Sequence, residues 1–174
     1  MTRLQKGKTN RLRKIIFLFF GICLLLSLMA CSSLYVTRNN FASPLPVKLI
    51  LRNDDYGSGY FGAKRSGGRI HKGIDLLADV GTPVLASKSG VVKYARHKKG
   101  NGNYVVLDHF WGYKTYYCHL LKITAKEGQR VNAGQVIGYV GKTGNANRAG
   151  IEPHLHFEVH KDNRPNDPAL VILI

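Results

Sequence analysis

Short apolar runs separated by glycines are the feature of this sequence that most restricts its fold. From Tyr56 onward, runs rich in β-branched and aromatic residues alternate with glycine-containing turns, at residues 84–86, 90–94, 104–107, 114–119, 135–140 and 154–160. No stretch of about 11 residues shows a convincing helical period. The sequence therefore predicts a mainly β, compact antiparallel domain over residues 56–174, with residues 47–51 as a candidate strand before it. About 120 residues are enough for one ordinary hydrophobic core.

The first thirty residues are predicted to be a secretory signal rather than part of this domain. Six Lys and Arg residues without any acid precede residue 15, and residues 15–30 are almost wholly apolar. These sixteen residues are fewer than the roughly 20 that a membrane-spanning helix needs. The signal ends in Leu28-Met29-Ala30-Cys31, which resembles the lipobox of a bacterial lipoprotein, so residues 1–30 are predicted to be removed and Cys31 to take lipid. An uncleaved membrane anchor is the alternative, and both hypotheses place the rest of the chain outside the cytoplasm.

Residues 31–55 are predicted to be a tether between the lipid and the domain, because serine, asparagine and proline are frequent there. The whole chain has a formal charge of +16. Residues 31–174, with 20 Lys and Arg against 10 Asp and Glu, keep a charge of +10. A basic exported protein meets anionic lipid headgroups and wall polymers. The export signal and the lack of a nucleic-acid-binding motif exclude nucleic acid as a partner.

The cysteines predict no disulfide in the mature chain. Cys23 leaves with the signal and Cys31 takes lipid, so only Cys118 remains. Alternation along a strand points Cys118 away from the neighbouring His119, and Cys118 is predicted to be a small buried residue.

Four of the seven histidines and one aspartate form a candidate catalytic zinc site: His71, Asp75, His119, His154 and His156. Two neutral imidazoles and one carboxylate are enough protein ligands for a hydrolytic zinc ion, which keeps one coordination position for water. Five candidates for three ligand positions leave two histidines as proton carriers or charge-stabilising groups. A buried aspartate such as Asp75 is costly unless it is paired or bound to metal.

Strand alternation predicts which of these side chains share a face. His154 and His156 are two residues apart and should leave the same face of one strand, with Leu155 and Phe157 pointing into the core. The remaining histidines are left out of the chemistry: His97 and His160 as surface residues, and His109 as a residue that either closes a hairpin or approaches the site.

The segments around His119 and around His71 and Asp75 can also direct their side chains toward the site. Tyr117 and His119 are two residues apart and should also share a face. A turn at Gly73, a residue that tolerates unusual backbone angles, brings His71 and Asp75 toward one cation. Three segments that are distant in the sequence are therefore predicted to meet around one metal ion.

Several short motifs follow one another in a fixed order between residues 61 and 168. They include His71-Lys72-Gly73-Ile74-Asp75-Leu76, Gly81-Thr82-Pro83-Val84, and Pro153-His154-Leu155-His156-Phe157-Glu158-Val159. In these motifs the chain resembles the lysostaphin/LytM-type zinc endopeptidases of bacterial cell walls. The resemblance covers nearly the whole domain and implies a compact antiparallel β fold with the active site in a groove. Residues 145–151 lengthen one loop relative to this family and are expected to shape the groove.

The resemblance also implies roles for the site residues. It makes His71, Asp75 and His156 the ligands of one Zn²⁺ per domain, and His119 and His154 the catalytic histidines beside the metal. Tyr117 and Glu158 are added as candidates for orienting an imidazole. The alternatives are a packing aromatic for Tyr117 and an exposed strand residue for Glu158.

The family and the export signal together predict the substrate and the location. An exported lipoprotein of this type is expected to hydrolyse peptide cross-links in peptidoglycan. Ser32 after the modified cysteine suggests the outer membrane of a Gram-negative cell, facing the periplasm, and therefore the D-alanyl–meso-diaminopimelate bond. Two other functions compete with this one. One is a non-catalytic wall-binding activator of a peptidoglycan amidase, and the other is a biotinyl- or lipoyl-type carrier domain built on a hairpin at residues 131–140.

Overall fold

The computed structural model describes residues 17–25 and 40–172, and the chain divides into two units, Met1–Asn39 and Asn40–Ile174. In the first unit, residues 17–25 form a helix with exposed apolar side chains. Among the described residues, no helix has the length and apolar character needed to cross a membrane. The cationic start of the predicted signal and the predicted lipidation site Cys31 lie outside the described residues. Both therefore stay predictions.

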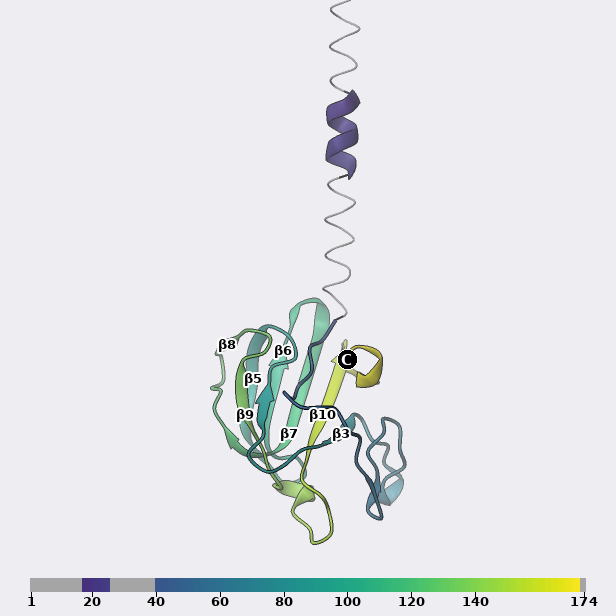
Figure 1. Ribbon diagram of the computed structural model, residues 1–174, viewed down its shortest axis with the longest axis vertical. Coiled ribbons are helices and arrows are strands. Elements are labelled where there is room, and N and C mark those ends of the chain that lie inside the picture. Colours follow the sequence, from purple (N-terminus) through teal and green to yellow (C-terminus); the bar gives the residue numbers. More distant parts are fainter. Residues whose placement is uncertain (1–16, 26–39, 173–174) are drawn as a thin grey trace, which may run out of the picture. The chain divides into compact units, whose positions relative to one another are not determined.

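The second unit is built on one antiparallel sheet of nine strands (Figure 1). Its strands run in the order β11-β10-β7-β6-β5-β8, while β3 pairs with β10, and β9 pairs with both β7 and β4. The strands are β3 (Ile74–Leu77), β4 (Pro83–Leu85), β5 (Gly90–Lys98), β6 (Gly102–Asp108), β7 (Tyr113–Ile123), β8 (Arg130–Val131), β9 (Val136–Val140), β10 (His154–Lys161) and β11 (Arg164–Asn166). The predicted antiparallel β fold is confirmed.

Shorter elements connect and flank this sheet. A separate hairpin consists of β1 (Asn53–Asp54) and β2 (Gly57–Ser58). Four single-turn 3₁₀ helices are η1 (Ser66–Gly68), η2 (Phe110–Gly112), η3 (Gly144–Ala146) and η4 (Pro168–Leu170). Within residues 40–172 these turns are the only helices, as the lack of a helical period predicted.

All six predicted strand runs overlap a strand of the sheet. Residues 47–51, the candidate first strand, are not a strand, and only Leu51 forms an isolated bridge, with Leu76. The carrier-type hairpin at residues 131–140 does not form, because β8 pairs with β5 whereas β9 pairs with β4 and β7. Strands β3, β8 and β11 were not predicted, since so few residues hardly show a period.

Strand β10 shows how the sheet separates the core from the site. Leu155, Phe157 and Val159 point to one face and are fully buried in the main hydrophobic core. Burial of each such side chain stabilises the fold by roughly 1.5–3 kcal/mol. The alternate residues, including His154 and His156, line a groove on the other face. The predicted alternation along this strand is therefore confirmed.

The compact unit begins at Asn40 rather than at the predicted boundary, residue 56. Phe41 is fully buried, and its ring packs edge-on against Tyr113 at a centroid distance of 5.4 Å. Leu45 is buried in the same core. Residues 40–55, which composition assigned to the tether, are thus part of the domain. The prolines and asparagines of this segment give it the composition of a linker, although a few of its apolar side chains anchor it in the core.

Candidate metal centre and its groove

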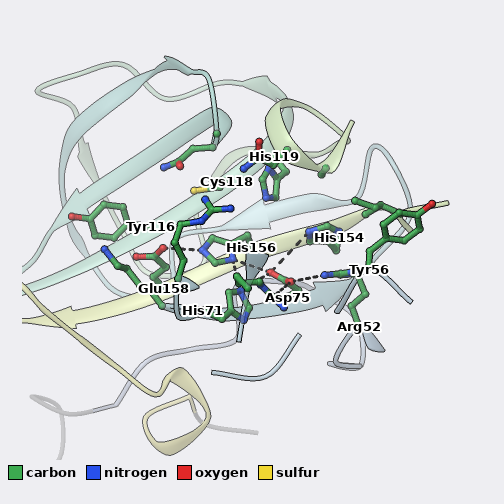
Figure 2. A pocket seen from close by; sticks show the side chains of 18 of the residues that line it. Arg52, Tyr56, His71, Asp75, Tyr116, Cys118, His119, His154, His156 and Glu158 are labelled. Carbon is green, nitrogen blue, oxygen red and sulfur yellow. Dashed lines mark hydrogen bonds and ion pairs between the residues drawn. The ribbon is translucent and has the colours of Figure 1, made fainter. Parts of the chain in front are cut away.

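Strands β3 and β10 bring the central residues of the site together. They pair antiparallel with Asp75 opposite His156, so both side chains leave the same face (Figure 2). His71 lies just before β3. Gly73 has no positive φ, contrary to the predicted need for unusual backbone angles. A Cβ at Gly73 would instead lie 2.2 Å from the carbonyl oxygen of Phe157, so glycine is required for the close approach of the two backbones.

Three potential ligand atoms meet at this point. His71 Nε2 lies 3.0 Å from Asp75 Oδ1 and 2.9 Å from His156 Nδ1, and His156 Nδ1 lies 2.8 Å from Asp75 Oδ1. Among the described residues these three form the group whose ligand atoms are close enough to share one metal ion. His71 and Asp75 are buried, and the side chain of His156 is 14% exposed.

The far nitrogen of each ligand imidazole has an acceptor as its partner. His71 Nδ1–H donates to the carbonyl of Tyr60 at 2.7 Å, and His156 Nε2–H donates to the carboxylate of Glu158 at 2.8 Å. With a metal ion bound, each ring would be neutral with one proton, so His71 Nε2 and His156 Nδ1 would be unprotonated and would present lone pairs to the ion together with Asp75 Oδ1. Three such atoms within 3.0 Å of one another require a positive charge between them, which either a metal ion or a proton on an imidazole can supply. The donor set of two imidazoles and one carboxylate fits a metal ion of the zinc type.

Asp75 is ionised and held in place by two arginines. Arg52 and Arg65 each donate to Asp75 Oδ2 at 3.0 Å, which leaves Oδ1 for the two histidines. Burial raises the pKa of Asp75, but its hydrogen bonds with His156 and His71 outweigh burial and hold that pKa well below its usual range. Neither arginine was predicted from the sequence, because both lie in irregular segments with no motif around them.

When no metal ion is bound, His156 can take up a proton on the nitrogen that would otherwise bind the metal. Burial lowers its pKa, but hydrogen bonds with Asp75 and Glu158 outweigh burial and raise the pKa to about 9. Without a metal ion, a proton on His156 Nδ1 therefore satisfies Asp75. A positive charge therefore lies next to Asp75 both with a metal ion bound and, in its absence, with His156 protonated.

His119 reaches the groove through a β-bulge. Between β6 and β7, Asn103 pairs with Leu120 and Val105 with Tyr117, so Cys118 and His119 stand opposite the single residue Tyr104. His119 has a φ of 66°, which is the left-handed region that a residue with a Cβ rarely adopts. The extra residue reverses the alternation of the strand. His119 and Cys118 therefore both line the groove, contrary to the prediction that they point to opposite faces. Cys118 is buried, as predicted.

Tyr117 does not reach the site, and the prediction that it shares a face with His119 is wrong. Its side chain is fully buried in the main core. The backbone N–H of Ser87 donates to its hydroxyl at 2.8 Å. Tyr117 is thus a packing residue with a satisfied hydroxyl, and the bulge at His119 is the reason the two residues separate.

His119 and His154 present a second pair of basic nitrogens beside the candidate metal centre. His119 Nδ1–H donates to the carbonyl of Thr143 at 2.9 Å, and His154 Nδ1–H donates to the carbonyl of Glu152 at 2.7 Å. Each Nε2 is therefore the lone-pair nitrogen of a neutral ring. The two rings lie 5.1 Å apart, and His154 Nε2 lies 4.0 Å from Asp75 Oδ1, farther than the two ligand imidazoles.

Burial keeps both of these histidines neutral near pH 7. Burial is the main cause that lowers the pKa of His119 to about 3, and the charges of His156 and His154 act in the same direction. Burial also lowers the pKa of His154, although the charge of Asp75 opposes this shift. A neutral imidazole with an open Nε2 can accept a proton, so the pair can act as general bases.

Glu158 joins the ligand His156 to a further histidine. Its carboxylate accepts from His156 Nε2–H at 2.8 Å (Figure 2). It also accepts from His160 Nε2–H at 2.5 Å. Burial raises the pKa of Glu158, but these two hydrogen bonds outweigh it and lower the pKa to about 2. His160 is 8% exposed and lines the groove, so its predicted surface position is wrong. Alternation along β10 would have placed His160 on the face of His156 and Glu158.

The five predicted site residues lie in one groove of about 790 Å³, a size typical of ligand sites. Residues 145–151 line it in part, through Asn145, Ala146, Arg148 and Ile151, as their predicted role in shaping the groove requires. His109 lies outside it, where its Nδ1–H donates to the carbonyl of Ser89.

The chain is similar to known proteins in both sequence and fold. The chain is 45% identical over 95 residues to the peptidoglycan DD-endopeptidase ShyA of Vibrio cholerae, which covers 55% of this chain and 21% of that protein. A zinc-containing peptidase of Vibrio cholerae has a TM-score of 0.60 and 38% identity, covering 74% of this chain and 39% of the other. The catalytic domain of the antimicrobial peptidase lysostaphin from Staphylococcus simulans has a TM-score of 0.58 and 34% identity, covering 66% of this chain and 89% of the other.

The shared part is a domain of larger proteins in most of these cases, since the chain spans between 21% and 23% of the length of the curated relatives it matches. Residues 69–168 match the family described as Peptidase family M23. This match covers more than half of the chain and contains the three residues of the candidate metal centre as well as His119 and His154. The chain therefore belongs to peptidase family M23.

Proposed function

We propose that this chain is a zinc-dependent endopeptidase that hydrolyses peptide cross-links of peptidoglycan, at the bond between D-alanine and meso-diaminopimelate. The observation that supports this most is the meeting of three potential metal-ligand atoms with two neutral histidines in one groove. The name of ShyA supports the substrate class. The whole set of five residues is present, which favours catalysis over the role of an inactive amidase activator.

His71, Asp75 and His156 would hold the zinc ion. When bound there, zinc supplies a Lewis acid for a peptide carbonyl and lowers the pKa of a water ligand to about 7. Arg52 and Arg65 hold Asp75 in place through Oδ2, which leaves Oδ1 for the metal ion. Glu158 keeps the proton of His156 on Nε2, so that Nδ1 stays a ligand atom.

His119 and His154 would move the proton. Either Nε2 can accept a proton from the attacking water, and the resulting imidazolium can then donate it to the leaving amine. The carbonyls of Thr143 and Glu152 fix the two rings so that these nitrogens stay turned away from the backbone. Burial keeps both rings neutral before the reaction.

The test uses purified peptidoglycan sacculi and mass analysis of the released fragments. The wild-type chain should cut cross-links in the presence of zinc. His71→Ala should lose both bound metal and activity. His119→Ala should keep the metal and lose roughly 10²–10⁴-fold in activity, because only the proton carrier is removed. Cleavage of the sugar chain, or removal of the peptide from it with cross-links untouched, contradicts the proposal. An intact wall-remodelling effect of His71→Ala in cells would instead support the activator hypothesis.

We also propose that the chain is exported and lipid-anchored at Cys31, in the outer membrane and facing the periplasm. The support is the cationic start, the apolar run and the lipobox-like end of residues 1–31. Metabolic labelling with an alkyne-bearing fatty acid should mark the wild-type chain and not Cys31→Ala. A wild-type chain without label would exclude the lipid anchor.

A further inference from the structure

The groove is lined by far more positive than negative charge. Seven of the nineteen Lys and Arg residues between positions 40 and 172 line it, but only two of the ten Asp and Glu residues do. Both acids are already engaged, Asp75 by two arginines and two histidines, and Glu158 by His156 and His160. Of the cations, Arg52 and Arg65 are held by Asp75. Five cations remain.

These five are named here the cationic rim: Lys64, Arg69, Lys72, Lys98 and Arg148. All five are exposed. Among residues 17–25 and 40–172, no acidic side chain lies within ion-pair distance of any of them. Three cations outside the groove do have such partners: Lys93 with Asp108, Arg96 with Glu127 and Lys161 with Asp162. The cationic rim differs from the rest of the surface because its five cations line one groove, and the two acids of that groove are already engaged.

The cationic rim comes from three separate segments. Three members lie in the stretch between β2 and β3, Lys98 ends β5, and Arg148 lies in the loop before β10. A ligand that lies in the groove is therefore met by positive charge from several sides. Partly enclosed cations of one sign focus the field and attract anions more strongly than the same charges on a flat surface. Carboxylates are suitable partners, because Lys and Arg donate short charge-assisted hydrogen bonds to them.

We infer that the cationic rim recognises free carboxylates of the substrate, so that the enzyme prefers cross-linked peptides with unmodified carboxylates over peptides in which these groups are amidated. This inference rests on the proposed peptidase function and specifies which form of the cross-linked peptide the groove takes. The metal centre and the two catalytic histidines act on the scissile bond in both substrates, and the rim acts on the groups beside it.

The experiment compares two synthetic cross-linked peptide dimers that contain the same D-alanyl–meso-diaminopimelate bond. In one, the side carboxylates of the stem peptides are free, and in the other they are amides. The wild-type chain should cleave the free-carboxylate dimer about three- to tenfold more efficiently in kcat/KM, as expected for a few partly exposed ion pairs. This preference should shrink as salt is raised from 50 to 500 mM, because salt screens exposed charges.

Two charge-matched variants identify the residues responsible. Replacing one rim residue from each segment, Lys64→Gln, Lys98→Gln and Arg148→Gln together, should raise KM for the free-carboxylate dimer and leave the amidated dimer unchanged. The control triple Lys122→Gln, Lys126→Gln and Arg130→Gln removes the same charge outside the groove and should keep the wild-type preference.

Equal cleavage of both dimers by the wild-type chain overturns this inference and leaves the proposed function intact. The same holds if the control triple abolishes the preference as fully as the rim triple, since net charge would then be the cause. Cleavage of neither dimer, together with intact sacculi, overturns the proposed function and the inference with it.

Discussion

At the scale of single residues, the site depends on acceptors that hold each imidazole by one nitrogen. Backbone carbonyls do this for His71, His119 and His154, and they cannot change their charge. His156 differs, because its partner is the carboxylate of Glu158. Only at His156 can a single conservative substitution of the partner side chain remove a charge. Such a substitution is therefore expected to change the affinity of the site for metal.

Glu158→Gln is expected to weaken metal binding about 10- to 100-fold, the range typical of partners that orient a metal ligand. The amide keeps the shape and can still accept from His156, but it lacks the charge that favours the required tautomer. Competition with a chromogenic chelator measures the affinity. Glu152→Gln is the matched control, since Glu152 contacts His154 only through its backbone carbonyl. Equal affinities of the Glu158 variant and the wild type would contradict the role of this carboxylate.

His109 provides a prediction on pH that does not involve the metal centre. Burial lowers its pKa below the ordinary 6.5, and Lys88 acts in the same direction, while a hydrogen bond to Ser89 and the charge of Asp108 oppose them. Between the folded and unfolded pKa values the unfolded state binds more protons. The free energy of unfolding therefore falls as pH drops below about 6.5, and levels off below the folded pKa.

Replacing His109 by Gln should remove this contribution and flatten the pH profile by up to about 1.4 kcal/mol per pH unit. Urea unfolding of zinc-loaded protein between pH 5 and 7.5 gives the slope. The variant loses the hydrogen bonds of the ring and should be less stable at pH 7, but its stability should change less on acidification. A variant with the wild-type slope would show that His109 stays neutral in both states or charges in both. His97→Gln, at an exposed position, is the comparison.

At the scale of elements, the alternation of β10 was predictable and the geometry of β7 was not. In β10, four polar residues alternate with apolar residues. Only one orientation of this strand buries the apolar residues in the core, so its two faces can be predicted from the sequence. In β7 the extra residue at His119 exists only because β6 supplies one partner where β7 has two. A bulge depends on a neighbouring strand that is not adjacent in sequence. This is why Tyr117 and Cys118 were both placed on the wrong side relative to His119.

In a regular strand, an alanine variant is usually more stable than a glycine variant. At the bulge residue His119 this order of stability should be reversed. Glycine in a regular strand is less stable than alanine by roughly 0.5–1 kcal/mol, but a left-handed φ costs any residue with a Cβ about 1–2 kcal/mol. His119→Gly should therefore be more stable to urea than His119→Ala, with both strongly reduced in activity. At Lys122, in the same strand and without positive φ, the glycine variant should be the less stable one. A His119→Ala variant as stable as His119→Gly would mean that the bulge relaxes when the ring is removed.

At the scale of the whole molecule, residues 40–55 are part of the compact unit that carries the groove. Backbone hydrogen bonds join Arg52 N–H to the carbonyl of Asp75 and Asp75 N–H to that of Gly59, so this segment runs beside β3. Only residues 32–39 then separate Cys31 from the compact unit. Such a stretch reaches about 30 Å at most when extended. Under the proposed lipid anchor, the groove would act on wall close to the membrane.

A truncation series tests whether the domain begins at residue 40 or at residue 56. A chain of residues 40–174 should fold and retain zinc and activity, because Phe41 and Leu45 fill the core and Arg52 holds Asp75. A chain of residues 56–174 should lose metal affinity and much of its stability, since it lacks both the buried side chains and the guanidinium at Oδ2. Phe41→Ala in the full chain separates these causes. It should cost about 3–5 kcal/mol in unfolding free energy and leave metal affinity nearly unchanged, because the cavity forms away from the ligands. If residues 56–174 alone bind zinc and cleave peptidoglycan as well as residues 40–174, the segment is a tether after all, and its contacts with β3 contribute nothing to the site.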